Sequence, residues 1–159
     1  MRKTDSRGSE IYSGDVFELL YEYEISRSKY YPSALTLIKI EMSYTAQNDA
    51  LLSSAATVFA KALNSHLRSV DIPALTGNLY TVLFPTSNEH GARAICERLL
   101  SVFRNKFSFS NGDIVFSLQI GATTHGGGSS MSGESLLNKA DEALKQSKLK
   151  GPNTYVLLL

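Results

Sequence analysis

Segments with the periodicity of an amphipathic helix alternate with short apolar segments of strand length along most of this 159-residue chain. The alternation is interrupted once, between Pro73 and Pro85, where two short apolar runs flank Thr76, Gly77 and Asn78. Glycine and asparagine tolerate the positive φ that a tight turn requires, so this stretch is typical of a β-hairpin. The pattern predicts an α+β fold in which helices cover a mixed central sheet.

Capping residues and prolines set the expected element boundaries. Ser13 or Asp15 can accept backbone N–H groups at the start of a first helix, and Pro32 disfavours helical geometry just beyond its expected end at Lys29. The order of elements is that of the ferredoxin-like fold, as in polymerase palms and class III nucleotide cyclases. We expect helices over residues 13–29, 49–70, 88–104 and 133–148, and strands over 34–40, 114–122 and 154–158 in addition to the hairpin.

Composition limits the classes of function. An apolar content of 43% is enough to bury one core, so we expect a flexible lead-in over residues 1–12 and a single domain over residues 13–159. The formal charge of +1 argues against a broad surface for nucleic acid or anionic membrane, and no apolar run approaches the ~18 residues of a membrane span. The single cysteine, Cys96, cannot form an internal disulfide, which fits a cytoplasmic protein.

Four segments carry a resemblance to one family, in the order in which that family has them. They are Leu67, Arg68 and Asp71 (LRxxD in the family), Val82–Pro85 with Thr86 (LLPxT), residues 94–99 (AxxAERI) and residues 136–153 (LLxxADxALYxAKxxGRN). Over residues 15–157 the chain therefore resembles a GGDEF domain, the catalytic domain of diguanylate cyclases. The resemblance implies the cyclase-like fold predicted above.

The residues that bind a divalent cation in that family are replaced in this chain. The family's first strand ends in DxD, and the matching residues are Lys39, Ile40 and Glu41, so that an ammonium stands at the first ligand position. A like charge ~4 Å from a cation costs roughly 4 kcal/mol per unit charge at a surface-like dielectric. The residues that match the hairpin signature, with a neutral amide in place of its metal carboxylate, are Thr76, Gly77, Asn78, Leu79 and Tyr80.

These replacements imply a degenerate domain that is not an enzyme, with no catalytic residue, metal or cofactor. Lys148 is nevertheless kept from the family pattern, whereas Pro152 replaces an arginine. Lys148 is therefore a candidate phosphate ligand, and together with Glu41 it is the remainder of a site for GTP or ATP binding or hydrolysis. The alternative is a solvated charge that suits the negative end of a helix.

Arg68, Asp71 and Arg98 match a second site of the family, where the product cyclic di-GMP binds. An arginine can pair bidentately with phosphate or guanine, and an aspartate can accept from guanine N–H groups. The alternative is a surface ion pair between Arg68 and Asp71, with Arg98 on a solvated face.

The tyrosine-rich stretch over residues 21–31 can either pack a helix on the sheet or present a contact surface. The sequence thus leaves three roles open. They are a regulatory module that binds a protein partner or a second copy of itself, a cyclic di-GMP receptor, and a residual nucleotide site.

Overall fold

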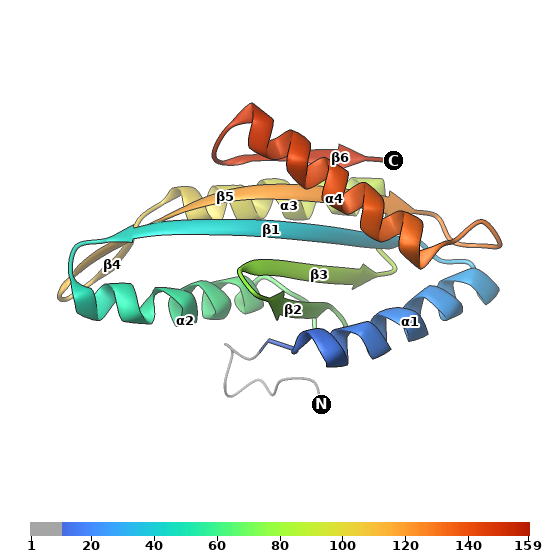
Figure 1. Ribbon diagram of the computed structural model, residues 1–159, viewed down its shortest axis with the longest axis horizontal. Coiled ribbons are helices and arrows are strands. Elements are labelled where there is room, and N and C mark those ends of the chain that lie inside the picture. The colour runs from blue at the N-terminus through green and yellow to red at the C-terminus, as the bar shows by residue number, and fades with distance from the viewer. Residues whose placement is uncertain (1–10) are drawn as a thin grey trace.

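Six strands form one mixed sheet with helices on both of its faces in the computed structural model, which describes residues 11–159 (Figure 1). The path through the sheet is β2-β3-β1-β5-β4, and β6 pairs with β5 in the parallel direction, which confirms the predicted α+β class and mixed sheet. The elements are α1 (Gly14–Tyr30), β1 (Leu35–Ala46), α2 (Asp49–Ser65), β2 (Ile72–Thr76), β3 (Leu79–Pro85), α3 (Glu89–Arg104), β4 (Phe107–Phe109), β5 (Gly112–His125), α4 (Gly133–Lys150) and β6 (Thr154–Leu158).

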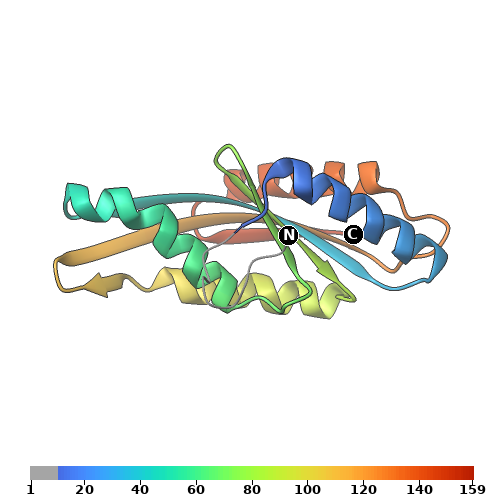
Figure 2. The same ribbon diagram turned by 90° about the horizontal axis from the view of Figure 1, so that it is seen from below.

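The sheet separates two apolar layers, because successive side chains of a strand point to opposite faces. On β1, Ile38 and Ile40 pack with residues of α2 and α3, whereas Leu35 and Leu37 pack with residues of α1 and α4. Figure 2 shows α1 beside α4 on one side of the sheet and α3 on the other. Lys39 and Glu41 belong to the same alternation as Leu37 and therefore face α4.

Each helix begins at a residue whose side chain accepts a backbone N–H of the first turn. These caps are Ser13, Asn48, Asn88 and Ser132, and each satisfies one of the free donors at its helix end. Helix α2 ends at Ser65, earlier than the predicted residue 70. Beyond it the chain turns, and the Asp71 carboxylate accepts from the backbone N–H of Arg68. None of the described helices is long and apolar enough to cross a membrane.

The two central strands are longer than the sequence predicts. β1 pairs with β5 from Leu35↔His125 to Ala46↔Ile114, although its apolar run ends at Ile40. Beyond Ile40 the strand carries exposed polar residues, so hydrogen bonding to β5, and not burial of both faces, maintains it. β4 was not predicted; it pairs with the start of β5.

The predicted lead-in covers residues 1–12, of which residues 1–10 lie outside the described part of the chain. Tyr12 is not part of a loose segment, because its backbone bonds to Pro73 and Leu75 of β2 and its side chain is buried. Tyr12 therefore packs with the domain that was predicted to begin at Ser13.

Helix α4 approaches β5 very closely at Gly121. A Cβ atom on this glycine would lie 2.1 Å from the backbone nitrogen of Leu144, a distance that no side chain permits. The absence of a side chain at Gly121 thus allows the backbone of α4 to rest directly on the strand.

Candidate functional site

Two ion pairs join β1 to α4 where the family resemblance places a cation. Lys39 contacts Asp141 through its Nζ, and Lys148 Nζ lies 2.5 Å from Glu41 Oε2. Lys39 and Glu41 are two residues apart on the strand, and Asp141 and Lys148 are seven apart on the helix, so both pairs span the same interface. Each of these two lysines is therefore neutralised by a carboxylate of this chain.

The hairpin tip lies beside Glu41. Residues 77 and 78 form the turn, with Gly77 at φ 60°, and Leu79 pairs with Glu41 while Thr81 pairs with Lys39. Thr76, Gly77 and Asn78 are exposed, and Tyr80 is buried against Phe59. Leu79 is partly buried, so Asn78 is the polar side chain that the turn presents to solvent.

These residues do not fit a divalent cation. Mg²⁺ is held in near-octahedral geometry by oxygen ligands, of which the protein usually supplies one or two carboxylates. Here Lys39 supplies a positive charge, Glu41 is engaged by Lys148, and Asn78 is neutral. Within residues 11–159, no group of three or more His, Cys, Asp or Glu side chains is placed to hold a metal ion.

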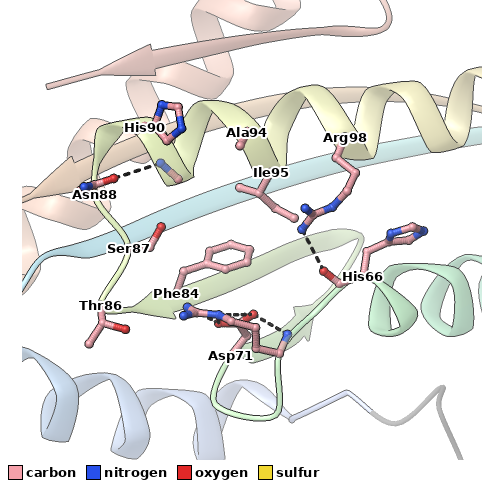
Figure 3. Close-up of a pocket in the computed structure, with 12 residues that line it drawn as sticks. His66, Asp71, Phe84, Thr86, Ser87, Asn88, His90, Ala94, Ile95 and Arg98 are labelled. Atoms are coloured by element: carbon pink, nitrogen blue, oxygen red, sulfur yellow. Dashed lines mark hydrogen bonds and ion pairs between the residues drawn. The ribbon is translucent and has the colours of Figure 1, made fainter.

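A hollow of ≈ 340 Å³ opens on the other face of the sheet, between the start of α3 and the turn after α2 (Figure 3). We call it the arginine pocket. Phe84 and Ile95 form its apolar floor, and Figure 3 shows Arg98 reaching across it from α3. The lining residues are His66, Arg68, Asp71, Phe84, Thr86, Ser87, Asn88, His90, Gly91, Ala94, Ile95 and Arg98.

Asp71 holds Arg68 in a fixed position. The Asp71 carboxylate accepts from Arg68 Nη2 at 2.8 Å and from the Arg68 backbone N–H at 2.7 Å, and Arg68 Nη2 also donates to the carbonyl of Pro85 at 2.7 Å. The Asp71 side chain is only 2% exposed, whereas that of Arg68 is 51% exposed. Asp71 therefore orients the guanidinium, and its burial does not support the direct contact to a guanine that the sequence indicated.

Arg98 enters the arginine pocket from the opposite wall. Its Nη2 donates to the carbonyl of His66 at 3.3 Å, and its side chain is exposed (Figure 3). This weak bond to a neutral acceptor leaves most of the guanidinium donors available. The two arginines that the sequence selected thus line one hollow from two elements.

The arginine pocket is cationic overall. Two arginines, Arg68 and Arg98, face it together with the first turn of α3, and its one acidic residue, Asp71, is already paired with Arg68, so that one positive charge remains. The positive end of a helix and two guanidinium groups favour an anionic ligand. No sequence motif marked His66 or His90, because they join the pocket only when the turn after α2 meets the start of α3.

Lys148 lies in a different place. It lines a hollow of ≈ 410 Å³ with Glu41, Ser43 and Pro152, on the α4 side of the sheet. The fold thus separates the predicted site residues into two groups on opposite faces, and Lys148 cannot act with Arg68 or Arg98.

The sequence matches the family described as "Diguanylate cyclase, GGDEF domain" over residues 45–154. Among curated proteins, diguanylate cyclase DgcS of Shewanella oneidensis is 31% identical over 99 residues, which cover 62% of this chain and 32% of that protein. The match thus spans about a third of the length of that curated relative.

Solved structures share the fold at low sequence identity. The GGDEF domain of YfiN (TpbB) from Pseudomonas aeruginosa gives a TM-score of 0.76 at 21% identity and covers 95% of this chain and 98% of that one. The GGDEF domain of DgcB from Caulobacter crescentus, in complex with c-di-GMP, gives 0.71 at 16% identity and covers 99% and 96%. Diguanylate cyclase SiaD from Pseudomonas aeruginosa, in complex with its activator SiaC, gives 0.76 at 18% identity and covers 95% and 60%.

The expectation that the chain is not an enzyme has to be corrected. It rested on single positions, whereas the family match extends over residues 45–154 and the curated relative is a diguanylate cyclase, so the relationship is to an enzyme family. The family resemblance itself is confirmed, since the match covers more than half of the sequence, and the chain belongs to the diguanylate cyclase GGDEF domain family.

Proposed function

We propose that this GGDEF domain is a regulatory module that binds cyclic di-GMP in the arginine pocket. The observation that carries the proposal is the convergence of Arg68 and Arg98, from the turn after α2 and from α3, on one open hollow. Cyclic di-GMP carries two phosphates and two guanines, and guanidinium groups bind both kinds of acceptor.

The roles of the three predicted residues differ. Arg68 and Arg98 donate to the ligand, and Asp71 is a positioning residue that keeps the Arg68 guanidinium at the pocket edge. A GGDEF domain of the same fold has been crystallised with c-di-GMP, which supports this choice of ligand.

Calorimetry with cyclic di-GMP tests the proposal. Hydrogen bonds to charged groups contribute about 1.5–3 kcal/mol, so Arg68→Ala and Arg98→Ala should each weaken binding by about tenfold or more. Arg93→Ala is the matched control, because Arg93 is an exposed arginine on the same helix that pairs with Glu89 and does not line the pocket.

Titrations with GTP and ATP complete the comparison. Absence of cyclic di-GMP binding at millimolar concentration, or equal losses in all three arginine variants, would contradict the proposal. Binding of GTP or ATP that Lys148→Ala abolishes would instead assign the role to the hollow beside α4.

A further inference from the structure

Helix α1 exposes large apolar side chains along one line. Leu19, Tyr23 and Tyr30 are 70%, 66% and 74% exposed, and their spacing of four and seven residues places them on the same side of the helix. Tyr21, by contrast, is buried and donates its hydroxyl hydrogen to the carbonyl of Gly133. The tyrosine-rich stretch therefore both packs inward and presents an apolar stripe outward.

An acidic groove lies beside this stripe, between α1 and α4, with a volume of ≈ 530 Å³. Tyr21, Ile25 and Leu137 line its apolar part, and the carboxylates around it are Glu18, Glu22 and Glu134. None of these three carboxylates forms a salt bridge with another described residue. A groove of this kind suits a segment that combines an apolar side chain with a positive charge.

Such a segment is present at the other end of the same helix. Lys29, Tyr30 and Tyr31 are all exposed, and Lys29, like the groove carboxylates, has no salt-bridge partner among the described residues. Within α1 the groove carboxylates Glu18 and Glu22 precede Lys29, so the helix is acidic near its start and basic near its end. Two antiparallel copies of such a helix bring unlike charges together at both ends.

We propose that α1 is a self-association surface, through which two copies of this chain pack antiparallel. Lys29 and Tyr30 of each copy then lie over Glu18 and Glu22 of the other, and the stripe of Leu19, Tyr23 and Tyr30 is covered. The contact is the same on both copies, so it closes at the dimer. A formal net charge of +1 adds little long-range repulsion between them.

Sedimentation velocity over a series of protein concentrations tests this surface. The wild-type chain should show a monomer–dimer equilibrium, and Lys29→Glu should raise its dissociation constant by about tenfold or more, since like charges then face each other. The double variant Glu18→Lys, Glu22→Lys should do the same. Lys61→Glu is the matched control, because Lys61 is exposed on α2 and its reversal changes the net charge equally.

The decisive arm is an equimolar mixture of Lys29→Glu with the Glu18→Lys, Glu22→Lys variant. Each variant alone should dimerise weakly. In the mixture the charges of the two variants are complementary at both ends of the helix pair, so the mixture should form a heterodimer. The proposal is overturned if the wild type stays monomeric at every concentration, if Lys61→Glu weakens the dimer as much as Lys29→Glu, or if the mixture remains monomeric.

Discussion

Lys39 on β1 and Asp141 on α4 form an ion pair in which the two side chains differ in exposure, at 12% and 56%. Removal of the exposed partner leaves an ammonium that is mostly withdrawn from water, whereas removal of the buried partner leaves a hydrated carboxylate. We therefore expect Asp141→Ala to lower the free energy of unfolding by about 1–3 kcal/mol and Lys39→Met by less than about 1 kcal/mol.

Urea unfolding of both single variants and of the double variant measures this asymmetry. The double variant should be close to Lys39→Met, because Asp141 has little further effect once the ammonium is gone. Equal losses for the two single variants would show that the pair is no more than a surface contact.

Acidic residues placed at positions 39 and 78 should create a cation site. In the variant Lys39→Asp, Asn78→Asp, carboxylates at both positions adjoin Glu41, which lies on β1 beside the hairpin. Mg²⁺ at a concentration one hundred times its Kd should then stabilise the folded variant by about 2.7 kcal/mol. This stabilisation is measured as a rise in the melting temperature of the variant. The variant Lys39→Met, Asn78→Ala is the control, and an equal Mg²⁺ effect on the wild type would contradict our account of this site.

The buried carboxylate of Asp71 should matter for stability as well as for ligand binding. Asp71→Ala removes the acceptor of the Arg68 backbone N–H and the carboxylate partner of its guanidinium, so we expect the free energy of unfolding in urea to fall by about 1–3 kcal/mol. Asp71→Asn keeps one carbonyl oxygen and should lose less. If the arginine pocket binds cyclic di-GMP, both variants should bind it more weakly, because the carboxylate of Asp71 no longer positions the Arg68 side chain. Circular dichroism checks that both variants are folded.

Cys96 should be unreactive in the native state. It is buried between α3 and the sheet, and desolvation raises the pKa of its thiol to about 12. Because folding favours the neutral thiol, this contribution to stability is complete below the ordinary thiol pKa of 9.0 and is lost as the pH rises toward about 12. Alkylation by iodoacetamide near pH 8 should therefore follow the rate of unfolding, and fast labelling of folded protein would show that the side chain is accessible.

Element types were predictable from this sequence because local rules set most of them. Ser13, one of the two predicted caps, begins α1, and α3 begins just after Asn88, where a helix was expected to start. The turn at Gly77 lies where the pattern placed it, since a positive φ favours glycine. The strand β4 was missed although Asn111 and Gly112 offer a hairpin signal. The run before that signal is short, and its exposed Phe109 does not mark a buried strand.

The candidate sites were predictable only in part. The family motifs selected Arg68, Asp71 and Arg98, but not that Asp71 is turned inward or that His66 and His90 line the same hollow. Likewise, the family resemblance indicated that Lys39 stands at an acidic position of the family, but not that Lys39 pairs with Asp141 of α4. Contacts between side chains from distant segments depend on how each helix packs on the sheet, and no local sequence pattern predicts that packing.

The missing side chain at Gly121 sets the position of α4 on the sheet. The backbone nitrogen of Leu144 lies directly against the strand at Gly121, and a shift of the helix along the sheet would break this close contact. Asp141 and Lys148 lie on either side of Leu144 along α4, so the contact at Gly121 helps to place them opposite Lys39 and Glu41. Both ion pairs between β1 and α4 accordingly depend on the absence of a side chain at Gly121.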